Sequence, residues 1–105
     1  MRFVETPVFT RTLKRLLDDE HYRSLQIALM LRPEQGALIR GSGGLRKLRW
    51  AGFDSGKRGG LRVIYYWAAA ELVFYMLYVY SKGEQGDLAA AQIKALGRLV
   101  REEFK

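Results

Sequence analysis

Helical periodicity gives way to strand-like alternation near residue 45, and this change limits the possible folds more than any other feature. Three runs rich in aromatic and β-branched residues follow, at about Leu45–Ala51, Leu61–Trp67 and Leu72–Tyr80. A Gly-rich loop over residues 52–60 joins the first two runs, and an Ala-Ala-Ala-Glu turn joins the last two. Connections this short require antiparallel pairing, because parallel neighbours need a long crossover. The sequence therefore predicts a three-stranded antiparallel meander.

A short strand and two helices are predicted before the meander. Phe3–Val4 indicates the strand, Thr6 suits a helix N-cap, and Pro7 suits the first helical position, where its missing N–H is not needed. Apolar residues then recur at helical spacing. The Asp18–Glu20 run interrupts this pattern and is expected to cap a second helix, which ends before Pro33.

A third helix is predicted at the C-terminus, with Asp87 as its cap. Its apolar stripe comprises Leu88, Ile93, Leu96, Val100 and Phe104, and its basic stripe comprises Lys94, Arg98, Arg101 and Lys105. The basic stripe is interpreted as a solvated face. The order β-α-α-β-β-β-α predicts an α+β fold, with helices packed on an antiparallel sheet in one domain over residues 1–105.

Positive charge is concentrated between Arg40 and Arg62. This segment carries seven lysines and arginines and one acid, Asp54, so that it holds +6 of the chain's net +7. A dense positive patch on the centre of a small sheet favours a phosphate-bearing partner. The alternative is that Lys and Arg on the outer face of a sheet only keep its edge soluble.

The alternation of side chains between the two faces of a strand selects three cations from this patch. Lys47 and Arg49 share one face of their strand, and Arg62 shares a face with Ile64 and Tyr66. Two cations at i and i+2 on a half-buried strand repel each other, and an anionic ligand gives a reason for them. If the two strands form a hairpin, Arg62 comes near Lys47 or Arg49, although the loop is too long to fix the register.

Other residues are candidates around these three cations. Lys82 follows the third strand and adds a further positive charge, and Glu84 lies two residues beyond it. The candidates for binding a nucleic acid are Arg46, Lys57, Arg58, Tyr66 and Tyr80. For a single residue such as Arg46 or Lys57, a solubilising role is the more frequent one. Tyr80 is a candidate for stacking on a base.

Several other kinds of site and location are not expected. The chain has no Cys and one His, so no metal site or cofactor is predicted. Gly56–Gly60 lacks the P-loop pattern and precedes a strand instead of a helix. The N-terminus has no apolar run of signal-peptide length, and the longest apolar run is too short to span a bilayer. A cytoplasmic protein is expected.

The order of these segments resembles a known family. The stretches GSGGLRKLRW, GKRGGLRVIYYW and FYMLYVYSKGEQGDL, followed by a basic helix, resemble the HigB-type branch of the RelE/ParE toxin superfamily. This resemblance implies the toxin of a type II toxin–antitoxin pair, a metal-independent endoribonuclease that cuts mRNA in the ribosomal A site. It implies products with 2′,3′-cyclic phosphate and 5′-hydroxyl ends, and a HigA-like helix-turn-helix antitoxin as partner.

The resemblance also assigns residues. Lys47 and Arg49 match the family's basic pair, Arg62 matches the arginine that opens the next strand, and Lys82 falls near the cation after the last strand. The family's tyrosine after that cation is absent from residues 83–88, and the histidines of other HigB proteins are also absent. Either the chemistry is divided differently here or Tyr80 substitutes.

Cyclising cleavage needs a base, a cation for the phosphorane charge and an acid. Lys47 is a candidate base, because neighbouring cations disfavour its protonated form. Arg62 is expected to hold the scissile phosphate, and Arg49 or Lys82 to offset the charge of the leaving group. Glu84 is an alternative base. Two other functions stay open: a ParE-like toxin that inhibits DNA gyrase, and an RNA-binding module without catalysis.

Overall fold

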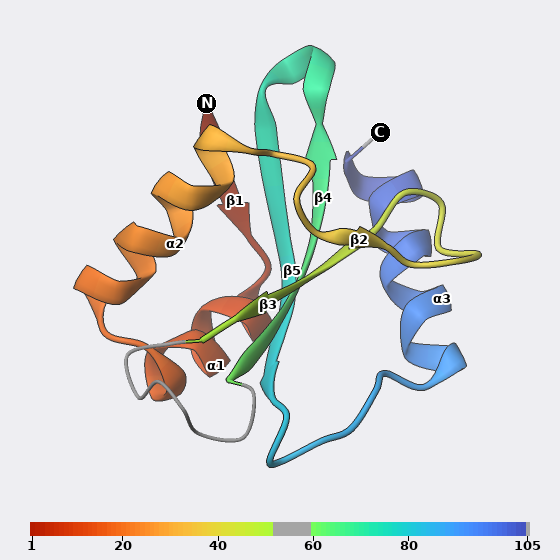
Figure 1. The fold of residues 1–105 in the computed structure, drawn as a ribbon. Coiled ribbons are helices and arrows are strands. Elements are labelled where there is room, and N and C mark those ends of the chain that lie inside the picture. Colours follow the sequence, from red (N-terminus) through yellow and green to blue (C-terminus); the bar gives the residue numbers. More distant parts are fainter. Residues whose placement is uncertain (52–59, 105) are drawn as a thin grey trace.

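The computed structural model describes residues 1–51 and 60–104, and in that part of the chain it shows three helices and a five-stranded sheet (Figure 1). The strands are β1 (Arg2–Glu5), β2 (Ala37–Leu38), β3 (Arg46–Trp50), β4 (Leu61–Ala68) and β5 (Val73–Ser81). The helices are α1 (Pro7–Leu16), α2 (Asp19–Leu31) and α3 (Ala90–Leu99). A 3-10 turn (Ala69–Glu71) joins β4 to β5, and a π-helical turn (Val100–Phe104) follows α3. The predicted α+β class is confirmed.

The sheet has the order β1-β5-β4-β3-β2. The predicted meander is present, because β3 pairs antiparallel with β4 and β4 pairs antiparallel with β5. Two features were not predicted. The two-residue strand β2 adds an antiparallel edge beside β3, and β1 pairs parallel with β5, with Arg2 opposite Val73.

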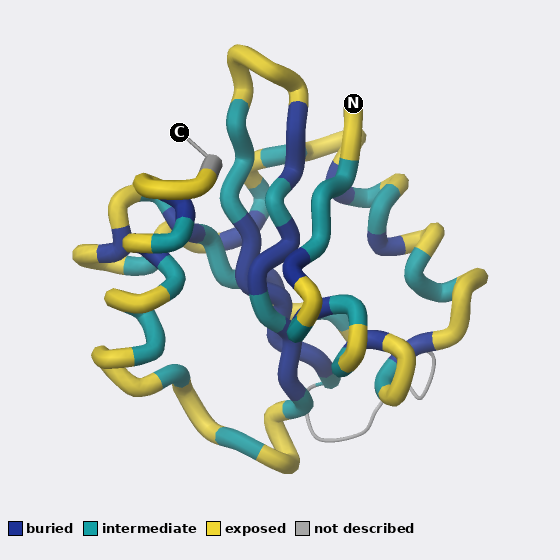
Figure 2. Tube along the Cα trace, turned by 180° about the vertical axis from the view of Figure 1, so that it is seen from behind, coloured by how far each residue is buried: buried dark blue, intermediate teal, exposed yellow. Residues whose placement is uncertain are grey.

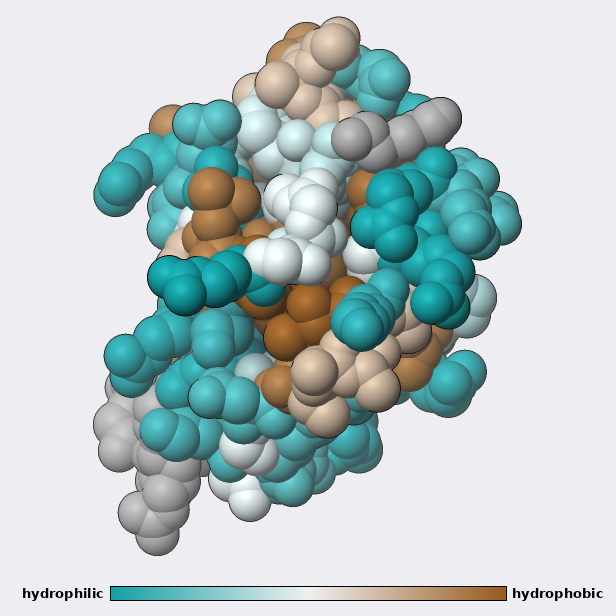
Figure 3. Space-filling model, turned by 90° about the vertical axis from the view of Figure 1, so that its right-hand side faces the viewer, coloured by the Kyte–Doolittle hydropathy of each residue, from teal (hydrophilic) through white to brown (hydrophobic). Residues whose placement is uncertain are grey.

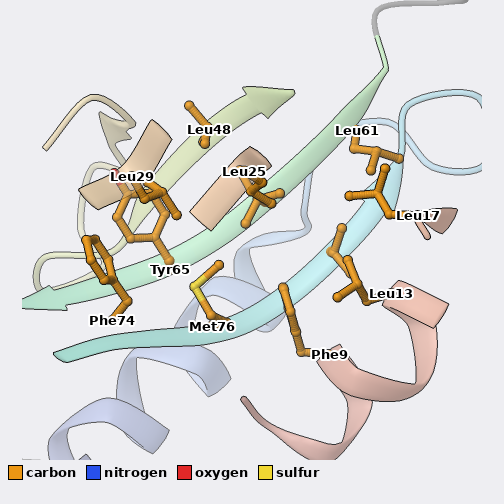
Figure 4. Close-up of a cluster of buried hydrophobic side chains, with 12 residues drawn as sticks. Phe9, Leu13, Leu17, Leu25, Leu29, Leu48, Leu61, Tyr65, Phe74 and Met76 are labelled. Atoms are coloured by element: carbon orange, nitrogen blue, oxygen red, sulfur yellow. The ribbon is translucent and has the colours of Figure 1, made fainter. Parts of the chain in front are cut away.

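The helices cover both faces of the sheet. In Figure 1, α1 and α2 lie on one side of the strands and α3 lies on the other. On the first side, Phe9 and Leu13 of α1 and Leu25 and Leu29 of α2 belong to the same buried cluster as Tyr65 of β4 (Figure 4). Figure 2 shows the burial of the central strands between exposed outer turns of the helices.

A second buried cluster lies on the α3 side of the sheet. Its fully packed members are Leu45, Ile64, Leu77, Tyr80 and Val100. Three further tyrosines, at positions 66, 75 and 78, are partly buried against it. The tyrosines of β4 and β5 therefore divide between the two faces, as the sequence predicted, with Tyr65 alone among these five on the α1–α2 side.

The predicted caps of the first two helices are confirmed. Thr6 Oγ1 accepts a hydrogen bond from Phe9 N–H at 3.1 Å, and the same hydroxyl donates to the carbonyl of Leu77 in β5 at 2.9 Å. Thr6 thus starts α1 and attaches it to the sheet. Asp18 caps α2 by accepting from His21 N–H at 2.8 Å, and this hydrogen bond lowers the pKa of the Asp18 carboxyl.

The predicted cap of the third helix is wrong. Helix α3 begins at Ala90, and the Gln92 side chain accepts the Ala89 N–H at 2.8 Å. Gln92 therefore satisfies one of the free N–H groups that Asp87 was expected to satisfy. None of the helices in residues 1–51 and 60–104 combines the length and apolar character needed to cross a membrane.

Replacing Thr6 tests how α1 is attached to the sheet. Thr6→Ala removes the cap and the buried hydrogen bond to β5, so we expect the free energy of unfolding to fall by about 2 kcal/mol in urea titrations. Thr6→Ser keeps the hydroxyl and should restore most of this loss. Thr12→Ala on the same helix is the control. An equal fall in the free energy of unfolding in that variant would mean that the loss in Thr6→Ala does not come from the two hydrogen bonds of Thr6.

Candidate active site

The register of β3, β4 and β5 brings two predicted cations and a tyrosine into one row across the sheet. Arg49 lies opposite Arg62, and Arg62 lies opposite Tyr80. Residues directly opposite each other share a face, with Cβ atoms about 4.5–5.5 Å apart. Lys47 lies opposite Ile64 in the next row on the same face. The structure therefore brings together the three cations that the alternation of side chains selected, on the face that α3 covers.

Arg62 is the most buried of these cations. Its residue is 7% exposed, whereas Arg49 is exposed and Lys47 is partly exposed. The Arg62 Nη1 group lies 3.4 Å from the carbonyl of Leu61. Two arginines directly opposite on neighbouring strands repel each other, and an anion between them converts the repulsion into attraction. The Arg49–Arg62 pair is thus suited to hold one phosphate.

The Tyr80 hydroxyl completes this row. Tyr80 is 4% exposed, and its hydroxyl is buried with no hydrogen-bond partner among the described residues. Burial raises the pKa of Tyr80, and the negative charge of Asp87 raises it further, while Arg62 acts in the opposite direction. The hydroxyl therefore keeps its proton. A buried donor without a partner is unfavourable, and such groups are often found at sites that bind or react.

Asp87 lies beside Lys47 instead of capping α3. Its Oδ1 atom is 3.2 Å from Lys47 Nζ, and the carboxylate is largely exposed. The sequence predicted Lys47 as a base because only cations were expected around it. Asp87 supplies a negative charge there, which removes the physical reason for that prediction. The site thus contains a carboxylate that sequence reasoning assigned elsewhere.

Glu84, the alternative base, is held by α1. Its Oε2 atom lies 2.7 Å from Nη1 of Arg15, so its carboxylate is paired with a helix on the opposite side of the sheet from α3. Lys82 is exposed, and its backbone N–H donates to the carbonyl of Gly60 at 3.2 Å. This bond places Lys82 beside the start of β4, near Arg62.

Arg46 faces away from the site. It lies opposite Tyr65, on the α1–α2 face of the sheet. Its guanidinium donates to the carbonyls of Glu34 and Gly36, at 2.9 and 2.8 Å. Arg46 therefore fixes the segment after α2, and we leave it out of the candidate site.

The remaining RNA-binding candidates lie apart from the row. Tyr66 is on the correct face but four residues along β4 from Arg62, or about 13 Å, and its ring stacks on Tyr75 with centroids 6.5 Å apart. Lys57 and Arg58 lie outside the described residues.

An apolar cavity of about 220 Å³ opens beside Tyr78, whose ring lies 5.9 Å from that of Tyr80. It is lined by Val8, Tyr78, Leu88, Gln92, Ala95 and Leu96. Such an apolar surface with an aromatic ring suits a nucleobase. Within the described part of the chain, no three His, Asp or Glu residues lie close enough to hold a metal ion.

No protein-family model matches this chain. Among solved structures, it is similar to the Escherichia coli toxin RelE in a free state, determined for a mutant with two Arg-to-Ala substitutions. The two chains share 13% sequence identity with a TM-score of 0.58, and the match covers 91% of this chain and 92% of the other. This similarity shows that the fold is RelE-like.

Removal of two buried tyrosine hydroxyls should have different effects on stability. Tyr80→Phe removes a hydroxyl that has no partner in the described structure, so the free energy of unfolding should stay constant or rise by up to about 1 kcal/mol. Tyr65→Phe removes a hydroxyl that accepts from Gly36 N–H and donates to the carbonyl of Pro33, and should cost about 1–3 kcal/mol.

Urea unfolding of both variants measures this difference. A Tyr80→Phe protein as destabilised as Tyr65→Phe would mean that the Tyr80 hydroxyl has a stabilising partner in solution.

Proposed function

We propose that this chain is a RelE-like toxin of the HigB type, from a type II toxin–antitoxin system, and that it is a ribosome-dependent endoribonuclease. It would cut mRNA in the ribosomal A site without a metal ion or cofactor and so inhibit translation. Its partners would be the ribosome, mRNA and a HigA-like helix-turn-helix antitoxin, in the cytoplasm. The RelE-like fold and the family motifs around Lys47 and Arg62 support this proposal.

The observation that carries the proposal is the Arg49–Arg62–Tyr80 row. This half-buried face presents two adjacent guanidinium groups and a hydroxyl that has no hydrogen-bond partner in residues 1–51 and 60–104, so it has donors for several oxygens of one phosphate. Arg62 is 7% exposed, and burial restricts its side chain, so its guanidinium needs little reorganisation when charge develops on the phosphate. A solubilising role does not explain why an arginine should be buried there.

In the proposed reaction, the ribose 2′-oxygen attacks the adjacent phosphorus and the bond from phosphorus to the 5′-oxygen breaks. The 2′-hydroxyl gives its proton to a base, and an acid gives a proton to the departing 5′-oxygen. Arg62, Arg49 and the Tyr80 O–H would stabilise the phosphorane, with Lys82 as a further cation near the leaving group. The ribosome would supply the alignment of the RNA that such a site lacks by itself.

Asp87 is a better candidate for the base than Glu84. Its carboxylate lies at the cationic face, next to Lys47, whereas the Glu84 carboxylate is paired with Arg15. Both acids are exposed and belong to the segment between β5 and α3. The two residues therefore form a matched pair for experiment.

Neutralising Arg62 tests the site. Arg62→Gln should reduce the rate of mRNA cleavage on translating ribosomes by about 100- to 1,000-fold, as expected for loss of a preorganised donor to the reacting phosphate. Arg49→Gln changes an exposed residue and should reduce the rate less. Primer extension on the mRNA measures the cuts, and urea unfolding confirms that each variant folds. Arg11→Gln on α1 is the control.

Assays of the wild-type protein distinguish the endoribonuclease from a gyrase-inhibiting toxin and from an RNA-binding module. A folded Arg62→Gln protein that cuts at the wild-type rate would exclude this site. Wild-type protein that leaves mRNA intact but blocks supercoiling by gyrase would favour a ParE-like toxin. RNA binding without either activity would favour a binding module.

Replacing the two carboxylates separates their roles. We expect Asp87→Asn to reduce cleavage at least 100-fold, because loss of a general base typically costs that much, and Glu84→Gln to change it little. The measurement is single-turnover cleavage on ribosomes. The reverse order of effects would assign the base to Glu84, and equal wild-type rates would point to Lys47.

A further inference from the structure

A groove separate from the candidate active site lies between α3 and the loop that follows β2. Its volume is about 220 Å³, and its lining includes Gly41, Ser42, Lys94, Gly97, Arg98 and Arg101. In Figure 3, which looks onto the side of the molecule that carries this loop and α3, strongly hydrophilic side chains flank a neutral strip, and a hydrophobic patch lies below that strip. We call this feature the α3 groove.

The groove is built by close contact between backbone segments. A Cβ atom on Gly97 would lie 2.7 Å from the carbonyl oxygen of Ser42, so the loop lies directly on the helix only because residue 97 is glycine. The Ser42 hydroxyl donates to the carbonyl of Ile39 at 2.6 Å and accepts from Leu45 N–H at 3.0 Å. These bonds hold the loop in shape, so the groove exists before any ligand binds.

Positive charge lines one wall of the groove. Lys94 and Arg98 belong to α3, and Arg101 belongs to the π-helical turn that follows it. The three recur at i, i+4 and i+7, so they lie along one side of the groove over about 10 Å. Like charges at this spacing destabilise a helix. Arg40 directly precedes the loop and is exposed, and in residues 1–51 and 60–104 no ion pair involves any of these four cations. The acids Glu102 and Glu103 follow Arg101 and are exposed.

The composition of the groove favours a polyphosphate over a protein. Centres of protein interfaces are rich in aromatic and apolar residues, whereas among the described residues that line this groove Ile93, which is partly buried, is the one large apolar side chain. A linear series of cations beside open backbone suits a strand with regularly spaced phosphates. The loop glycines leave room for that strand to approach the protein backbone.

We propose that the α3 groove binds the phosphodiester backbone of RNA, as a second contact beyond the candidate active site. The groove would position an RNA strand without reading its sequence, because its donors face phosphates. The inference deepens the proposed function, since it takes RNA as the ligand of both sites.

The test measures binding of a 20-nucleotide 2′-O-methyl RNA, which cannot be cleaved by attack of a 2′-hydroxyl. Lys94→Gln/Arg98→Gln should lower the slope of log affinity against log salt concentration by about 1.4, because each phosphate contact to a single strand contributes about 0.7. Arg11→Gln/Lys14→Gln removes two exposed cations from α1 and is the control for net charge. Its slope should stay near that of the wild type.

Three outcomes would overturn the inference: an unchanged slope in the Lys94/Arg98 variant, an equal decrease in both variants, or loss of binding to a polyglutamate peptide without loss of RNA binding. The last result would assign the groove to an acidic protein. Wild-type mRNA cleavage is measured separately, so a protein that binds RNA through the groove but never cuts it would refute only the proposed function.

Discussion

Pairing of β4 with strands on both of its sides is the constraint on which the rest of the molecule depends. Because side chains alternate along a strand, the two registers decide which residues of three strands face each helical layer. Tyr65 faces α1 and α2, whereas Arg62 and Ile64 face α3. A shift of one residue would exchange these sets, placing a charge in the larger core and an aromatic ring in the site.

Much of the fold could be predicted from the pattern of neighbouring residues in the sequence. The caps at Thr6 and Asp18 depend on neighbours within three residues, and the meander follows from connection length. By contrast, β2 is two exposed residues without apolar alternation, and the parallel partner of β1 lies some seventy residues away. Neither leaves a local signal, so the sequence predicted a smaller sheet than the structure contains.

The candidate active site was likewise predicted only in part from local sequence pattern. The alternation of side chains placed Lys47 and Arg49 on one face of their strand but left open how Arg62 faces them, and the structure places Arg62 opposite Arg49. The face on which Tyr80 lies could not be predicted from simple alternation along β5. Ile64 pairs with Tyr78 while Tyr65 pairs with Met76, so β5 carries one extra residue there. The side chains after this bulge therefore change face. The sequence also did not predict three side-chain contacts, those of Arg46, Glu84 and Asp87, because each partner comes from a distant segment. Charge density alone does not distinguish an arginine that braces a loop from one that faces a ligand.

The parallel pairing of β1 with β5 has a consequence for how the protein is made. Arg2 meets Val73, so the first strand leaves the ribosome some seventy residues before its partner. At about 5–20 residues per second, that interval lasts roughly 4–14 s. During it, Thr6 also lacks its acceptor on Leu77, and α1 has no sheet to cover. The order of synthesis therefore delays completion of the sheet until β5 has emerged.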